Sequence, residues 1–320
     1  MIPSDTYISY LAAKKSVDDR ALNRYVWQKL KAGLRPSTPR EPLRVIEFGA
    51  GIGTMFERVV EWGLAPHMHY TLVEQNPDYL DGFRSRSVPE QFGRSHTPHE
   101  RISDKAAAVE THGSPAVETL CADLYDVIAE PGQQGQWDLI IAHAVMDLVE
   151  AAEVLAGFAR LVKPGGLLYL SLIYDGCTEF LPSEDPDFEQ ALLCRYHLSM
   201  DRRATRHGHT GTSRAARAMF SRLAALNLPI LAAGGSDWLV YPRAGRYPAD
   251  EAFFLDTIID TIDRQLQQDP AVDPDRLAAW ASRKHNRVKA GELIFMARNM
   301  DFLARGPALQ QQAVTPHQPI

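Results

Sequence analysis

The chain has 320 residues, of which 45% are hydrophobic and 23% charged, which is the composition of an ordinary globular protein. This length allows one large domain or two ordinary ones with a sizeable core. The formal net charge of -6 argues against a broad surface for nucleic acid or anionic membranes, and no apolar run is long enough for a membrane helix. The N-terminus lacks a signal-peptide core, so we expect a cytoplasmic protein.

The N-terminal segment, residues 1–40, is expected to be helical over residues 5–33. The sequence SVDD, from Ser16 to Asp19, resembles a helix capping box, and Gly33 followed by Pro36 predicts the end of the segment. Apolar residues at helical spacing indicate that it packs on the body of the protein. A lid is the other option, in which Tyr10 and Arg20 would contact a bound ligand.

Short apolar runs then alternate with helical patterns through residues 41–305. Five runs predict strands at residues 43–49, 69–75, 117–123, 137–144 and 166–174. Their almost continuous apolar character fits parallel strands that are covered on both faces. Two later strands are expected from Ser236 and Glu292, with helices near 249–268 and 273–289 between them. The fold class is therefore α/β and doubly wound.

Three further stretches lie outside this alternation. Residues 85–115 are polar and are expected to form a long surface loop. Residues 176–231 predict an arginine-rich helical insertion after the fifth strand. Residues 306–320, rich in Gln and Pro, are expected to be disordered. The widely spaced Cys121, Cys177 and Cys194 favour free thiols, and the histidine pairs in HTPH and HGH are expected to be loop residues rather than metal ligands.

A glycine-rich turn follows the first expected strand, in IEFGAGIGTM from Ile46 to Met55. Gly49 and Gly51 would let the backbone approach a ligand, and Gly53 would allow tight packing into the next helix. Dinucleotide-binding turns place the third glycine one residue later, so that a pyrophosphate can rest on a helix N-terminus. The acidic residue before this turn, Glu47, favours an ammonium group instead.

Five segments in this order resemble a class I S-adenosylmethionine-dependent methyltransferase: VIEFGAGIGT, TLVEQNP, CADLYD, WDLIIAHAVMDLV and LVKPGGLLYLSLIY. The resemblance covers residues 43–175, and the two late strands fit the reversed final pair of that fold. It implies a mostly parallel, seven-stranded Rossmann-like sheet. It also implies S-adenosylmethionine as the cofactor and S-adenosylhomocysteine as the product.

The same resemblance implies which residues surround the cofactor. Glu47 and the glycines would hold the methionine part, Glu74 the ribose, and Asp123 the adenine. The complete set is Glu47, Gly49, Ala50, Gly51, Gly53, Glu74, Gln75, Asp123, Leu124, His143 and Ala144. For each acidic residue the alternative is a helix N-cap or a surface charge at a strand end.

Methyl transfer from a sulfonium is an in-line displacement, which needs an aligned acceptor and, for some acceptors, a group that takes a proton. Candidates for that group are His143 and Asp147, after the fourth strand, and Asp175, after the fifth. Asp147 could instead cap the helix that begins near Glu150. The motif [DN]-P-P-[FYW], which marks enzymes that methylate exocyclic amines of nucleic-acid bases, is absent.

The insertion places Arg214 and Arg217 in the first turn of an expected helix, where cations oppose the helix dipole. A carboxylate or phosphate of the substrate would compensate them, and so would an internal acidic residue such as Asp201. The residues expected to contact substrate are Tyr10, Arg20, Tyr174, Arg214 and Arg217.

The sequence thus predicts methyl transfer to a small molecule, an anionic one if the arginines bind it, with residues 176–231 as a substrate cap. Two alternatives stay open: a non-catalytic S-adenosylmethionine-binding subunit or sensor, and a methyltransferase for RNA or protein. The spacing of the glycines disfavours a nicotinamide oxidoreductase. We expect no metal, nucleic acid or membrane partner, and either a monomer or a homodimer.

Overall fold

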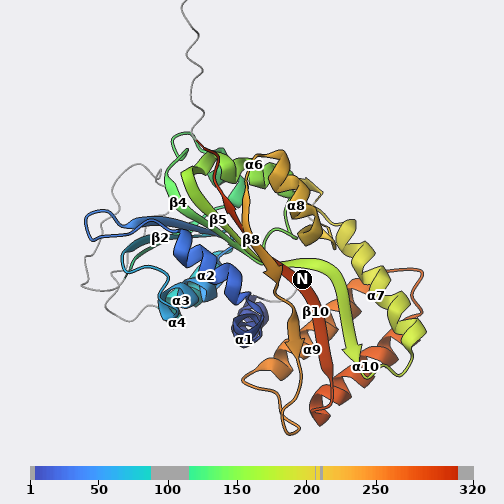
Figure 1. Ribbon diagram of the computed structural model, residues 1–320. Coiled ribbons are helices and arrows are strands. Elements are labelled where there is room, and N and C mark those ends of the chain that lie inside the picture. The colour runs from blue at the N-terminus through green and yellow to red at the C-terminus, as the bar shows by residue number, and fades with distance from the viewer. Residues whose placement is uncertain (1–3, 88–114, 206, 210–211, 309–320) are drawn as a thin grey trace, which may run out of the picture.

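The structure is a computed structural model that describes residues 4–87, 115–205, 207–209 and 212–308 (Figure 1). Its central sheet consists of β1 (Leu43–Phe48), β2 (Met68–Glu74), β3 (Ala116–Cys121), β4 (Trp137–His143), β5 (Val162–Leu181), β8 (Ile230–Gly235), β9 (Trp238–Val240) and β10 (Ile294–Arg305). A separate two-stranded sheet is formed by β6 (Ala204–Thr205) and β7 (Gly208–His209).

The strand order is β3-β2-β1-β4-β5-β10-β8, and β9 pairs with β10 outside this path. The first five strands are parallel, whereas β10 runs antiparallel to both β5 and β8. The predicted fold class, a doubly wound and mostly parallel sheet with a reversed strand near one edge, is confirmed. The sheet has eight strands rather than the seven predicted: the strand expected from Ser236 corresponds to β9, whereas β8 was not predicted.

Ten helices surround the sheet in the described part of the chain: α1 (Ser4–Ala21), α2 (Arg24–Gly33), α3 (Thr54–Glu61), α4 (Pro77–Ser87), α5 (Leu124–Ala129), α6 (Ala151–Leu161), α7 (Pro186–Asp201), α8 (Ala215–Ala225), α9 (Glu251–Leu266) and α10 (Pro274–Ala290). Helices α2, α3 and α4 pack on one face of the sheet, and α5, α6 and α8 pack on the other (Figure 1). Among the described residues, no helix combines the length and apolar character needed to cross a membrane.

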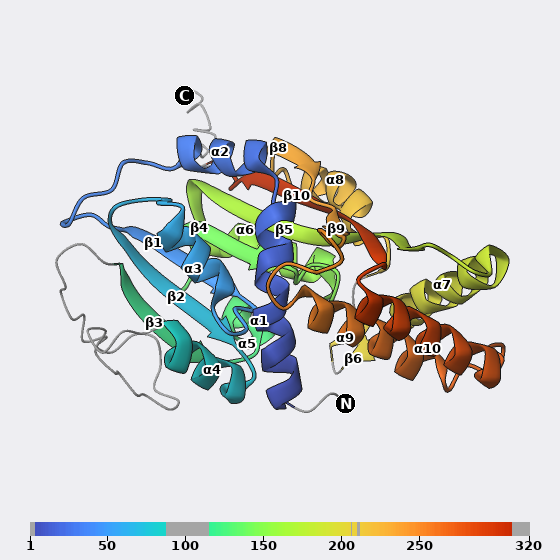
Figure 2. The same cartoon turned by 90° about the horizontal axis from the view of Figure 1, so that it is seen from below.

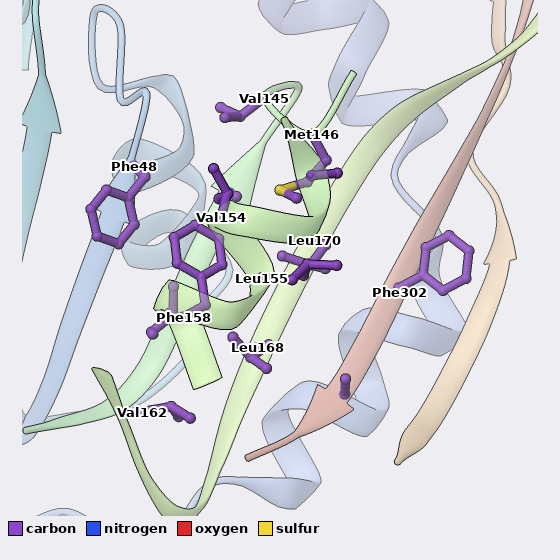
Figure 3. Close-up of a cluster of buried hydrophobic side chains, with 14 of the residues drawn as sticks. Phe48, Val145, Met146, Val154, Leu155, Phe158, Val162, Leu168, Leu170 and Phe302 are labelled. Carbon is purple, nitrogen blue, oxygen red and sulfur yellow. The ribbon is translucent and has the colours of Figure 1, made fainter. Parts of the chain in front are cut away.

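Neighbouring residues of a strand belong to different hydrophobic clusters, because successive side chains point to opposite faces. Val45 packs with the α2 and α3 side, whereas Ile46 packs with the α6 side. On the α6 side the rings of Phe48 and Phe158 stack with their centroids 4.9 Å apart, and Phe302 of β10 belongs to the same cluster (Figure 3). Burial on both faces explains why these strands appear in the sequence as continuous apolar runs.

β5 and β10 continue beyond the sheet as an antiparallel pair that reaches Leu181 and Ile294. Helices α7, α9 and α10 lie around this extension (Figure 2), and a third hydrophobic cluster joins them to the strands. Phe180 of β5 and Phe295 of β10 pack there, with ring centroids 5.1 Å apart. The extension therefore has a core of its own beside the edge of the main sheet.

Three expectations about the elements were wrong. Ser16 lies inside α1 and does not cap a helix; instead the Asn23 side chain accepts a hydrogen bond from the Val26 amide at the start of α2. The fifth strand does not end near residue 174 but continues to Leu181, because it pairs with β10 in the extension. Residues 230–235, which were not expected to form a strand, form the edge strand β8, while the strand expected from Ser236 is the short β9. The expected loop at 85–115 and the expected tail lie mostly outside the described residues.

Candidate functional site

A cavity of about 690 Å³ opens at the carboxyl ends of β1, β2 and β4. In an open α/β sheet, ligands bind at this edge. Helix α1 borders the cavity and lies between the sheet and α9 (Figure 2). Most of the site residues predicted from the sequence line it: Tyr10, Glu47, Gly49, Ala50, Gly51, Glu74, Gln75, Asp123, Leu124, His143, Ala144, Asp147 and Tyr174.

The turn after β1 adopts a backbone conformation that favours glycine. Gly49 and Gly51 have φ values of +67° and +55°. A Cβ atom on Gly49 would lie 2.5 Å from a methyl group of Val145, so a side chain there would collide. Gly53 also has positive φ, but it does not line the cavity; its missing side chain makes room for the ring of Phe83 instead.

Glu74 joins the ends of β1 and β2. Its two carboxylate oxygens accept hydrogen bonds from the amides of Gly51 and Asn76, each at 2.9 Å. Burial raises the pKa of this carboxyl, while the amide hydrogen bonds oppose the rise. The glycine turn and the acidic end of β2 therefore form one structural unit at the wall of the cavity.

Glu47 is buried below the turn, where it accepts a hydrogen bond of 2.7 Å from the Tyr70 hydroxyl. Burial raises the pKa of Glu47 to about 8, so its carboxyl is mostly protonated at neutral pH in the absence of a cation. A cationic group placed against it would favour the ionised form. Glu47 is therefore suited to meet a positively charged part of a ligand.

Asp123 lines the cavity and also caps α5, where it accepts a hydrogen bond of 2.8 Å from the Tyr125 amide. Its other oxygen lies 3.5 Å from Nε2 of His207, in the turn between β6 and β7. The rings of His207 and Tyr125 stack, with centroids 3.9 Å apart. His207 was expected to be a loop histidine, since nothing in the sequence connects it with the end of β3.

A buried group of charged residues, which sequence reasoning missed as a group, lies where α1 meets α3 and β4. Asp18 is 2.5 Å from Lys14 and 3.2 Å from Nε2 of His143, and it also accepts a hydrogen bond from the Trp238 indole at 3.0 Å. Arg58 of α3 is completely buried and lies 3.5 Å from Asp18. Lys14, Asp18 and His143 line the cavity, so this charged cluster supports one of its walls.

His143 is neutral at physiological pH. Burial, together with the neighbouring charges of Arg58 and Lys14, lowers its pKa to about 4 despite the opposing effect of Asp18. A neutral ring that donates from Nε2 to Asp18 and accepts at Nδ1 from the Ser171 hydroxyl, at 2.9 Å, satisfies both nitrogens. Both nitrogens therefore already have partners within the protein.

Asp147 differs from His143, because one of its polar side-chain atoms has no partner among the described residues. Its Oδ1 atom is buried and has no hydrogen-bond partner among the described residues, although the side chain lines the cavity. Burial raises its pKa to about 6. The alternative interpretation, in which Asp147 caps the following helix, is wrong, because Glu150 caps α6 through the amides of Ala152 and Glu153. Among the predicted proton acceptors, Asp147 is the one that lines the cavity and has a carboxylate oxygen without a hydrogen-bond partner among the described residues.

Besides Gly53, four predicted site residues lie elsewhere, which corrects the expectation that they face a ligand. Arg20 forms an ion pair with Glu251. Asp175 accepts hydrogen bonds from the amide and guanidinium of Arg217, and it thereby compensates the first turn of α8. Arg214, the residue at the N-cap of α8, is exposed. None of these four side chains lines the cavity.

Metal binding finds no support in the described parts of the chain, which contain no cluster of three or more histidine, cysteine or acidic side chains able to hold an ion. The sequence HTPH lies outside the described residues. Asp123 and His207 are therefore considered only as a side-chain pair at the cavity wall.

No family model and no curated protein matches this chain. Among solved structures it is similar to phosphoethanolamine N-methyltransferase 2 of Haemonchus contortus (12% identity, TM-score 0.42, covering 88% of this chain and 52% of that one). It is also similar to a Bacillus halodurans protein provisionally assigned as a methyltransferase (13%, 0.48, 88% and 99%) and to the [4+2]-cyclase SpnF (14%, 0.41, 89% and 80%). The chain spans about half the length of the Haemonchus enzyme. Similarity at this level carries no argument about the reaction.

Proposed function

We propose that the cavity binds S-adenosylmethionine and that the protein transfers its methyl group to a small molecule. One observation carries this proposal: the turn with Gly49 and Gly51 is hydrogen-bonded to the carboxylate of Glu74 beside a cavity at the carboxyl edge of the sheet. Glycine there permits close approach of a ligand, and a carboxylate at the end of the second strand suits the two hydroxyls of a ribose.

The remaining wall suits the other parts of the same cofactor. Glu47 can accept the ammonium group of the methionine part, and ionisation of its carboxyl would accompany binding, because burial raises its pKa to about 8. Asp123 and Leu124 follow β3, where an adenine can be bound. The cavity continues past Ala144 to Asp147, which leaves space for a second molecule beside the reactive end.

Calorimetric titration tests the cofactor. S-adenosylmethionine, S-adenosylhomocysteine and NAD would each be titrated into the wild type, Glu74→Ala and Glu153→Ala, the last being an exposed control on α6. We expect binding of the first two ligands only, a loss of about tenfold or more in Glu74→Ala, and no change in the control. Binding of NAD alone, or equal affinity in Glu74→Ala and wild type, would contradict the proposal.

A further inference from the structure

The part of the cavity beyond the glycine turn has a different set of lining side chains. It reaches into the extension, where it is lined by aromatic, hydroxyl and aliphatic side chains, among them Tyr174, Thr178, Tyr196, Ile258 and Phe295. Two basic side chains, Lys14 and Arg203, occur among the described lining residues apart from histidines. Lys14 is already paired with Asp18, and Arg203 is exposed. The arginines once expected to attract an anion lie outside the cavity.

Asp147, which follows β4, lines the same cavity. Its buried Oδ1 atom lacks a partner among the described residues. Burial and, to a smaller extent, the charge of Asp147 raise the pKa of four surrounding tyrosines: Tyr7, Tyr10, Tyr174 and Tyr196. These rings come from α1, β5 and α7, and all four line the same cavity as Asp147.

A buried carboxylate without a partner favours a cation or a hydrogen-bond donor, because the low dielectric around it strengthens the attraction. Aromatic rings around such a carboxylate add a further preference for ammonium groups over anions. Lys14 and Arg203 are the basic groups whose charge acts on Asp147, and they only partly offset its burial. A carboxylate or phosphate in this part of the cavity would meet Asp147 with the same sign of charge.

We propose that the methyl acceptor is an amine with an apolar, arylalkyl body, whose nitrogen is bound by the carboxylate of Asp147 among Tyr10, Tyr174 and Tyr196. This inference rests on the proposed function and names its substrate class. The body of the amine lies against Ile258 and Phe295 in the extension. Such an amine differs from the anionic small molecule that the arginines of the sequence suggested.

The chemistry balances with the groups present. The ammonium form of the substrate gives one proton to Asp147, which leaves a neutral amine with its lone pair free. That pair forms the new N–C bond to the methyl carbon of S-adenosylmethionine, while the C–S bond breaks and its electrons stay on sulfur. The products are a methylammonium and S-adenosylhomocysteine, and Asp147 returns its proton to solvent. The raised pKa of Asp147, about 6, suits this exchange near neutral pH.

Three probes of similar shape test the assignment: 2-phenylethylamine, 2-phenylethanol and phenylacetate. Their binding to the full chain would be measured by NMR titration, both without a second ligand and with saturating S-adenosylhomocysteine. The proteins compared would be the wild type, Asp147→Asn and Asp187→Asn, an exposed control on α7. We expect the amine to bind about tenfold tighter than the alcohol or the acid, and Asp147→Asn alone to abolish that preference.

The outcomes separate this inference from the proposed function. Failure of every protein to bind S-adenosylhomocysteine would contradict the proposed function, while the amine preference measured without it still tests Asp147. Tighter binding of phenylacetate, or an amine preference that survives in Asp147→Asn, would overturn the inference. Unchanged affinity of Asp147→Asn for S-adenosylhomocysteine would show that the variant is folded and that Asp147 acts on the second molecule. A parallel loss of both affinities would assign Asp147 to the cofactor and overturn the inference.

Discussion

Asp18 ties α1 to the candidate site, so its replacement by asparagine perturbs the cavity wall in a defined way. Its carboxylate contacts Lys14 at 2.5 Å, His143 at 3.2 Å and the Trp238 indole at 3.0 Å. Burial alone would raise the pKa of Asp18, but Lys14, His143 and Arg58 hold it well below its usual range. The side chain is therefore ionised at every pH of physiological interest, and Asp18→Asn removes a full negative charge.

The expected cost follows from the charges left behind. Lys14 is buried and would lose its ion-pair partner, and breaking a buried pair in this way costs roughly 3–5 kcal/mol. Arg58 keeps its contact with Asp19 at 2.5 Å, and the asparagine oxygen can still accept from Trp238. We therefore expect the free energy of unfolding to fall by about 3 kcal/mol, near the lower end of that range.

The loss should depend on pH in a predictable direction. Burial already lowers the pKa of Lys14, and removal of Asp18 takes away the attraction that opposes this effect. In Asp18→Asn the unfolded state then binds more protons than the folded state, so the stability of the variant rises with pH relative to the wild type. The difference between the two proteins should shrink from pH 6 to pH 9.

Urea denaturation at pH 6, 7.5 and 9 would measure both effects. Asp5→Asn is the matched control, because the Asp5 side chain is exposed on the same helix and its removal leaves both Lys14 and Arg58 paired. We expect the control to lose clearly less stability than Asp18→Asn. A loss in Asp18→Asn below about 1 kcal/mol, or a loss that grows with pH, would refute the reasoning about buried charge.

Three further variants separate the roles of other residues. Gly49→Ala should weaken S-adenosylhomocysteine binding by about tenfold or more, because φ is +67° and Cβ would lie 2.5 Å from Val145; wild-type affinity in a titration would contradict this. Asp147→Asn should stabilise the ligand-free protein by about 3 kcal/mol at pH 8 but not at pH 3, because the raised pKa costs the wild type stability as pH rises through 6; equal thermal unfolding curves at pH 8 would count against it. Arg217→Ala should leave the affinity for S-adenosylhomocysteine unchanged within about twofold, because the partner of Arg217 is Asp175, outside the cavity. A larger loss of affinity would place Arg217 at the ligand.

The parallel part of the sheet could be predicted because its signal is local. Neighbours such as Val45 and Ile46 are both buried, one on each face, and this produces the continuous apolar runs that identify such strands. The edge strand β8, with the sequence ILAAGG, is mostly Ala and Gly, so its pairing with β10 depends on a tertiary contact that the sequence does not display. The extension of β5 to Leu181 depends on β10 in the same way.

The candidate site shows the same difference between residues with a local sequence signal and residues placed by tertiary contacts. The glycine turn and Glu74 could be predicted because they follow successive strands, whereas the position of Asp18 in the cavity wall, with Arg58 behind it, could not. Charged residues on an amphipathic helix ordinarily face water, and apart from Lys14 the partners of Asp18, such as His143 and Trp238, lie far away along the chain. The helix dipole predicted an acidic partner for Arg217, and Asp175 is that partner. Asp201, the partner suggested from the sequence, instead accepts a hydrogen bond from the Ser213 amide.

A crystal structure of the protein with S-adenosylhomocysteine tests the central claim most directly. We predict that the ligand lies in the cavity, with its ribose hydroxyls within hydrogen-bond distance of the Glu74 carboxylate and its sulfur directed toward the part of the cavity that contains Asp147. A ligand bound outside this cavity, or one whose ribose is remote from Glu74, would contradict the account.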